Sequence, residues 1–152
     1  MPDTAGPTPA APHGLSGRIR VLIVDDVKET RDKLKNIVNN DDELTVAGEA
    51  ANGLEAVEQY DRLAPDVVSM DINMPVMDGI EATARITSAA QWKCVVIASI
   101  QTDAYYLRRA VVAGASEYLV LPVDPSEYTA TLKRVARQKP TTPKTPPAPA
   151  PQ

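Results

Sequence analysis

Five short apolar runs alternate along the chain with segments whose apolar residues recur every three or four positions. Short continuous apolar runs bounded by turns are typical of strands buried on both faces, and the intervening spacing is typical of amphipathic helices. This alternation predicts an α/β fold, (βα)5, with a doubly wound five-stranded parallel sheet. The predicted strands are Ile19–Val24, Leu44–Glu49, Asp66–Met70, Lys93–Ala98 and Ser116–Leu121, and the predicted helices are Lys28–Asn39, Leu54–Leu63, Gly79–Ser88, Ala104–Ala113 and Pro125–Arg137.

Both ends of the chain lack this pattern. Of 14 prolines in 152 residues, ten lie at or before residue 12 or from residue 140 onward. A segment without apolar periodicity cannot bury enough surface to offset the entropy lost on ordering. We therefore expect a disordered tail over residues 1–17, one folded domain over 18–138, and a Pro/Ala/Thr-rich disordered tail or linker over 139–152.

Charge and apolar content narrow the functional classes. The formal net charge is −4 and the pI is about 5.0, which argues against a direct nucleic-acid surface. The first residues contain no apolar leader, and no apolar run is long enough to cross a membrane. We expect a cytoplasmic protein without direct nucleic-acid or membrane contacts.

Acidic residues follow two of the predicted strands. Asp25 and Asp26 follow the first strand, Asp71 follows the third, and Ser99 follows the fourth. Ligands of open α/β sheets bind at these strand ends, so the side chains should converge. Two such charges about 4 Å apart repel by roughly 4 kcal/mol at an effective dielectric of about 20, which calls for a proton or a cation. Aspartates are also preferred helix caps, but three at two strand ends favour a site for a hard cation such as Mg²⁺.

A carboxylate beside such a cation can attack a phosphoryl donor and form an aspartyl phosphate. The stretch from Ser69 to Gly79 reads SMDINMPVMDG. Together with Asp25 and Asp26, Ser99, and the segment that leads to Tyr118, it matches the motifs of a known family. The chain from about residue 18 to 137 resembles the receiver domain of two-component response regulators, of the chemotaxis-regulator-like kind. The resemblance implies a flavodoxin-like strand order of 2-1-3-4-5.

The resemblance also implies roles for individual residues. Asp71 would be the phosphoacceptor, and the cofactor would be Mg²⁺ or Mn²⁺. One hydroxyl residue and one aromatic residue would respond to phosphorylation as switch residues, and three further residues would shape the loops around the site. The implied metal ligands are Asp25, Asp26, Asp71 and the backbone carbonyl of Asn73; the switch residues are Ser99 and Tyr118; the loop-shaping residues are Pro75, Gly79 and Pro122.

The implied function is a phosphorylation-dependent switch and not an enzyme beyond phosphorylating and slowly dephosphorylating itself. Its donor would be a sensor histidine kinase or a phosphotransfer protein. The output would be a downstream protein, or an output domain joined covalently, since Ala98–Gln101 and Tyr105–Ala110 also resemble receivers attached to pilus-assembly-type ATPases. The switching surface would comprise the fourth helix, fifth strand and fifth helix, could form a homodimer, and would include Tyr105, Tyr106, Tyr118 and Tyr128.

One position departs from the family pattern. Leu121 stands where the family carries a Lys before the proline that ends the fifth strand. This departure implies slower phosphorylation or weaker coupling, and it leaves open a pseudo-receiver that binds partners without phosphate. A small phosphohydrolase is a third class, but Asn73 replaces the second Asp of haloacid-type phosphatases, and no Gly-rich phosphate loop follows the first strand.

Overall fold

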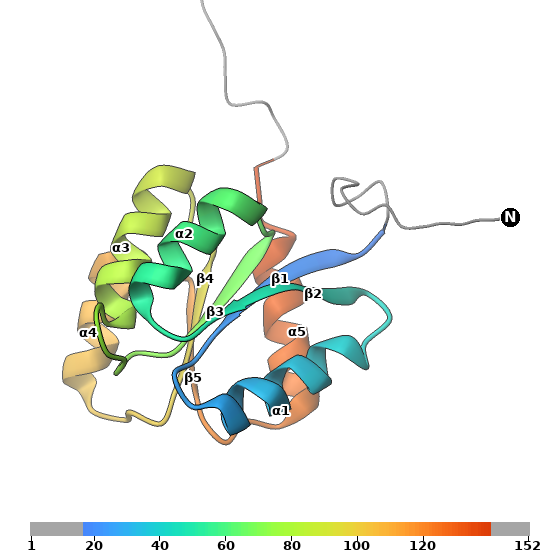
Figure 1. Cartoon of the computed structure of the whole chain (residues 1–152), viewed down its shortest axis with the longest axis horizontal. Coiled ribbons are helices and arrows are strands. Elements are labelled where there is room, and N and C mark those ends of the chain that lie inside the picture. The colour runs from blue at the N-terminus through green and yellow to red at the C-terminus, as the bar shows by residue number, and fades with distance from the viewer. Residues whose placement is uncertain (1–16, 141–152) are drawn as a thin grey trace, which may run out of the picture.

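The computed structural model describes residues 17–140, so most of the two predicted tails, 1–17 and 139–152, lies outside the described residues. Within that range, strands and helices alternate throughout, as the apolar pattern predicts (Figure 1). The strands are β1 (Ile19–Val24), β2 (Leu44–Ala50), β3 (Val67–Met70), β4 (Val95–Ser99) and β5 (Glu117–Val120). The helices are α1 (Lys28–Asn39), α2 (Gly53–Leu63), α3 (Gly79–Ala90), α4 (Ala104–Ala113) and α5 (Pro125–Ala136).

The strands form one parallel sheet in the order β2-β1-β3-β4-β5. Both the (βα)5 fold and the flavodoxin-like order are therefore confirmed. From β1 the chain moves outward to the edge strand β2 and then returns past β1 to the central strand β3. This reversal puts a topological switch point between the ends of β1 and β3, where open α/β sheets bind their ligands.

Alternate residues of each buried strand face opposite layers of helices. On β1, Leu22 and Val24 pack in the cluster that includes residues of α2, α3 and α4. Val21 and Ile23 pack in the other cluster, which includes residues of α1 and α5. Figure 1 shows the two groups of helices on opposite sides of the sheet. The period of two along a strand thus explains why its sequence is apolar throughout.

Nine element ends differ from the predicted bounds by one or two residues, and local hydrogen bonds and strand pairing account for three of them. β4 includes Ser99, which pairs with Val120 of β5. β2 extends to Ala50, which pairs with Val24. α2 begins at Gly53 because the side chain of Asn52 accepts a hydrogen bond from the Glu55 amide at 2.9 Å and caps the helix.

One predicted surface residue lies in the core. Tyr128 was expected on the switching surface, but it is fully buried between α5 and the sheet. Its hydroxyl donates a hydrogen bond to Ser69 Oγ of β3 at 2.7 Å. A buried tyrosine needs such a partner, and here it is a serine on the central strand. The expectation for Tyr128 is therefore wrong.

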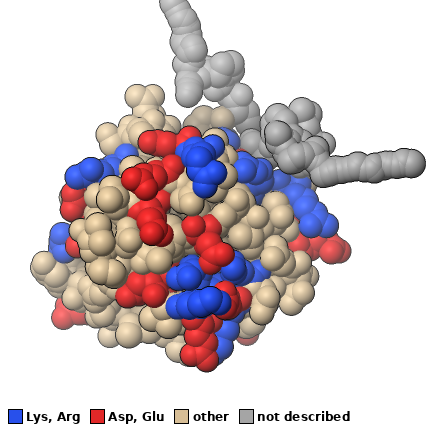
Figure 2. Space-filling model, viewed as in Figure 1, with Lys and Arg blue, Asp and Glu red and all other residues tan. Residues whose placement is uncertain are grey.

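The surface and the helix lengths give two further facts. Figure 2 shows acidic and basic side chains intermixed on the visible face, without a continuous basic stripe. Within residues 17–140, no helix is both long and apolar enough to cross a membrane.

Candidate functional site

The pairing of β1 with β3 brings the predicted acidic residues together. Val24 pairs with Met70, and the Asp71 amide donates to the Val24 carbonyl at 3.0 Å. One carboxylate oxygen from each of Asp25, Asp26 and Asp71 lies within 4.8 Å of the others. We call these three residues the acidic triad. The sequence-based prediction that they converge at one rim is confirmed.

The members of the triad differ in their exposure to solvent. Asp25 is buried, Asp71 is half-buried and Asp26 is exposed. Burial raises the pKa of Asp71 to about 7, and the neighbouring charge of Asp25 adds to the effect. Burial likewise raises the pKa of Asp25, against a hydrogen bond from the Val27 amide that lowers it. The triad is therefore a crowded set of oxygens whose repulsion a cation would relieve.

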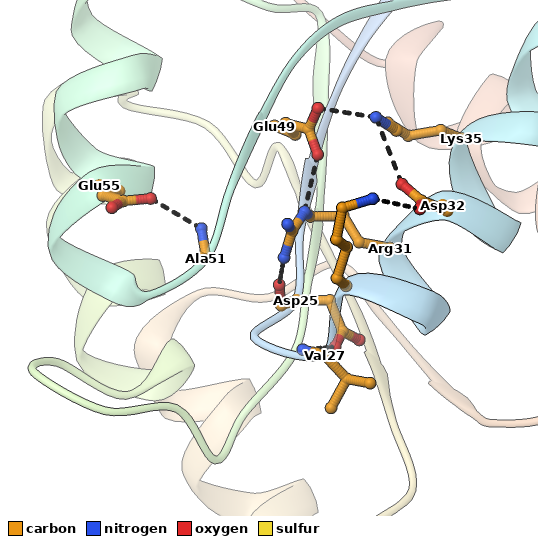
Figure 3. A network of polar contacts seen from close by, with 9 residues as sticks. Asp25, Val27, Arg31, Asp32, Lys35, Glu49, Ala51 and Glu55 are labelled. Atoms are coloured by element: carbon orange, nitrogen blue, oxygen red, sulfur yellow. Dashed lines mark hydrogen bonds and ion pairs between the residues drawn. The ribbon is translucent and has the colours of Figure 1, made fainter.

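A polar network holds the Asp25 end of the triad (Figure 3). Arg31 of α1 donates from Nη1 to the Asp25 carbonyl and from Nε to Glu49 Oε1 of β2, each at 2.7 Å. Lys35 donates to the other Glu49 oxygen at 2.7 Å. The Asp25 side chain itself accepts from the Val27 amide at 2.9 Å. The turn after β1 is thus tied to both α1 and β2, a contribution that the sequence analysis missed.

The loop after Asp71 is held close to the strand end. The Ile72 amide donates to Asp71 Oδ1 at 2.8 Å, and the Gly79 amide donates to the Ile72 carbonyl at 2.7 Å. A Cβ at Gly79 would lie 1.7 Å from the Asp71 carbonyl oxygen, so only glycine fits. The Met77 amide donates to the Pro75 carbonyl at 2.7 Å within the same loop. These contacts fit the loop-shaping roles that the resemblance implies for Pro75 and Gly79.

The predicted switch residues lie on the other side of Asp71, with Ser99 at the end of β4 and Tyr118 within β5. Ser99 is buried, and its Oγ accepts from the Gln101 amide at 3.2 Å. The Tyr118 hydroxyl donates to the Gln101 carbonyl at 2.8 Å. Both side chains therefore contact the loop that leads into α4. Their switching roles, like the metal-ligand role of the exposed Asn73, stay predictions.

Leu121 lies where the resemblance expects a lysine, and the structure gives it a packing role. Its side chain is half-buried against the core cluster beneath α1 and α5. Its amide donates to the Ser99 carbonyl at 2.9 Å, and the Leu121–Pro122 bond is cis, as the family pattern implies. Across residues 17–140, no Lys or Arg forms an ion pair with a carboxylate of the acidic triad. The rim thus holds three carboxylates and no fixed cation against them.

The fold and the acidic rim define a class: a flavodoxin-like α/β protein with a carboxylate cluster at the β1–β3 switch point. The family model for the response regulator receiver domain matches residues 21–133. The chain therefore belongs to the response regulator receiver family. It is a phosphoacceptor signalling module of the kind represented by the chemotaxis protein CheY.

Individual relatives agree with this assignment. The chain is 41% identical to the chemotaxis protein CheY of Thermotoga maritima over 118 residues, covering 78% of this chain and 98% of the relative. A solved structure of the response regulator domain of Thermotoga maritima CheB matches with a TM-score of 0.74 and 33% identity, covering 81% of this chain and 99% of that one. The CheX–CheY–BeF3–Mg²⁺ complex of Borrelia burgdorferi matches with a TM-score of 0.74 and 28% identity, covering 81% and 93%.

Proposed function

We propose that Asp71 accepts a phosphoryl group from a phosphohistidine of a sensor histidine kinase or phosphotransfer protein. The nucleophile is a carboxylate oxygen of Asp71, which forms the new P–O bond. The P–N bond to the donor imidazole breaks, and the imidazole nitrogen takes up a proton as it leaves. The observation that carries this proposal is the acidic triad, because it combines a nucleophile with two further carboxylates within 4.8 Å.

The donor set of the triad fits Mg²⁺ or Mn²⁺, since hard divalent ions prefer carboxylate and carbonyl oxygens. Asp25, Asp26, Asp71 and the carbonyl of Asn73 hold the ion in this proposal. When bound, such an ion neutralises charge on the phosphoryl oxygens and on the carboxylates. The complex of the Borrelia burgdorferi relative contains Mg²⁺, which supports the same assignment here.

The phosphoryl group is read out by Ser99 and Tyr118. A phosphoryl group adds about −1.5 to −2 charge and strong hydrogen-bond acceptors. Ser99 donates to it, which draws the loop after β4 toward Asp71 and disturbs the Tyr118 contact at Gln101. The surface of α4, β5 and α5 then changes its affinity for a downstream protein, an attached output domain or a second copy.

Phosphotransfer from a small donor tests the assignment of the nucleophile. The protein is incubated with Mg²⁺ and phosphoramidate, and its intact mass is measured. We expect a gain of one phosphoryl group in the wild type and none in Asp71→Asn. Asp78→Asn is the matched control, because Asp78 lies in the same loop and caps α3, where asparagine caps equally well. A phosphorylated Asp71→Asn variant, or a wild type that gains mass without Mg²⁺, would contradict the proposal.

Leu121 favours one alternative, a pseudo-receiver that binds its partner without phosphate. In that case the wild type gains no phosphoryl group from phosphoramidate under conditions that label a related receiver. The Leu121→Lys variant separates the two functions, because labelling that appears only after this substitution would assign the pseudo-receiver role to the natural sequence.

A further inference from the structure

A surface groove lies between α3 and α4. These two helices pack on the side of the sheet opposite α1 and α5 (Figure 1). Ile80 and Ala84 of α3 and Val112 and Ala113 of α4 line it. Val112 is 88% exposed, more than any other large apolar residue between 17 and 140. A single exposed valine needs no explanation, but this one borders a groove whose opposite wall is also apolar.

Contacts near the helix ends fix the separation of α3 and α4. Thr87 Oγ1 of α3 donates to the Ala113 carbonyl at 2.8 Å. Gly114 ends α4 with φ of 104°, and a Cβ there would lie 2.7 Å from Thr87 Oγ1. The two helices therefore touch at this end, and the groove beside the contact is largely formed before any ligand binds.

The charge around the groove is positive, although the whole chain carries −4. Arg108 and Arg109 of α4 line it, and the lining residue Glu81 is already paired with Arg85 at 2.8 Å. Arg109 lies over the Tyr105 ring at 5.4 Å, and within residues 17–140 neither Arg108 nor Arg109 has a carboxylate partner. Two guanidinium groups without counter-charges therefore flank an apolar strip.

We propose that this α3–α4 groove binds an acidic amphipathic helix of a partner protein. The apolar residues of that helix, spaced at i, i+3/i+4 and i+7, contact the strip around Val112, and its Asp and Glu residues pair with Arg108 and Arg109. α4 has ten residues, a length of about 15 Å, which accommodates about three turns of a docked helix. The groove pairs α4 with α3, whereas the proposed switching surface pairs α4 with β5 and α5.

Two adjacent valines of α4 provide a matched pair of variants. Val112 lines the groove, whereas Val111 is 58% exposed and points about 100° away around the helix. The probe is a synthetic helical peptide of about 14 residues with leucines at the stated spacing and glutamates beside them; a second peptide has lysines in place of the glutamates. Fluorescence anisotropy measures affinity, and amide chemical shifts locate the site.

We expect the glutamate peptide to bind the wild type, to shift the amides of Ala84 and Val112, and to bind at least tenfold more tightly than the lysine peptide. Val112→Glu should weaken binding about tenfold or more, and Val111→Glu by less than about twofold. Val112→Ser is a milder second variant, and thermal melts verify that each variant is folded.

Three outcomes would overturn the proposal. Equal affinities for the two peptides, or no binding at millimolar peptide, would show that the groove does not select an acidic helix. If Val111→Glu lost as much peptide affinity as Val112→Glu, the binding site would not be the face of α4 that borders the groove. A wild-type dimer in light scattering that Val112→Glu abolishes would show that a second copy occupies the groove instead.

Discussion

The rim formed by the carboxyl ends of the strands has two halves that differ sharply in charge. At the ends of β1 and β3, three carboxylates lie within 4.8 Å, and Arg31 ties the turn after Asp25 to Glu49 of β2. At the ends of β4 and β5, the corresponding groups are the buried Ser99 hydroxyl and Leu121, whose side chain packs into the core. The acidic half is crowded and well anchored, whereas Ser99 and Leu121 of the other half carry no charge.

This difference changes which group can neutralise the negative charge of the acidic triad. In the family pattern, a lysine at the end of β5 shares that work with the metal ion. With Leu121 at this position, a bound cation or a proton has to supply the charge neutralisation that a lysine would provide within the acidic triad. The comparison therefore predicts a protein whose acidic half is unusually sensitive to pH and to Mg²⁺.

The largest expected effect is on stability without metal. Asp71→Asn should raise the free energy of unfolding at pH 8 by about 2 kcal/mol. The whole pKa shift of Asp71 corresponds to roughly 4 kcal/mol, but solvent screens part of the half-buried carboxyl group. The pKa of Asp71 is raised from 3.8 to about 7, so across this window the folded state keeps a proton that the unfolded state has lost. The wild type should therefore lose stability as pH rises through this window. Urea unfolding in EDTA at pH 5 and pH 8 measures both values.

Asp78→Asn serves as the control, since Asp78 caps α3 and is not part of the triad. The free energy of unfolding of Asp78→Asn, relative to that of the wild type, should not increase between pH 5 and pH 8. Added Mg²⁺ at pH 8 should stabilise the wild type more than Asp71→Asn. Parallel pH profiles for wild type and Asp71→Asn would show that the triad is not crowded in solution.

A lysine at position 121 should reduce the difference in charge between the two halves of the rim. We expect Leu121→Lys to increase the rate of labelling by phosphoramidate about tenfold, or about 1.4 kcal/mol in activation free energy. The reason is that a cation at the end of β5 would neutralise charge on Asp71 and on the transferred group. Intact-mass measurements at fixed Mg²⁺ give the rate.

The variant also removes a half-buried leucine from the core cluster, so a neutral control is needed. Leu121→Gln removes the same packing and adds a polar side chain without charge. It should leave the labelling rate near that of the wild type. Equal rates for Leu121→Lys and Leu121→Gln would mean that charge at this position is irrelevant.

The parts of the site that follow from local pattern could be predicted from the sequence. Asp25, Asp26 and Asp71 directly follow buried strands, and in a parallel sheet such positions share one rim. Arg31 could not be found in the same way, because its contact with Glu49 joins α1 to β2 and depends on the helix rotation.

Other features depend on packing or on backbone conformation. Tyr128 shares its helical spacing with Leu132 and Val135, and the packing of α5 on the sheet buries all three side chains. Ser69 of β3 then supplies the buried hydroxyl with a hydrogen-bond partner. Val76, in the loop after Asp71, is 77% exposed and has φ of 70°, a left-handed conformation that β-branched residues avoid. No sequence pattern indicates such a strained residue, because the rest of the loop imposes its conformation.

The smallest expected effect concerns the anchor of the acidic half. Arg31→Gln should weaken Mg²⁺ binding about threefold, measured by calorimetry, because the turn that carries Asp25 loses its bonds to α1 and β2. Lys28→Gln is the control: Lys28 also lies on α1, but its side chain is 77% exposed and pairs with Asp32 of the same helix. It should leave the affinity unchanged.

Loss of positive charge near the triad would act in the opposite direction and strengthen Mg²⁺ binding. Positioning should prevail, because the charge of Arg31 is the weakest of the influences on the pKa of Asp25, whereas its two hydrogen bonds are short and join three elements (Figure 3). Arg31→Lys separates the two effects, since it keeps the charge but cannot make both bonds with the same geometry. If Arg31→Gln binds Mg²⁺ more tightly than the wild type while Arg31→Lys does not, then Arg31 acts through its field, and the anchoring of the acidic half must come from the strands alone.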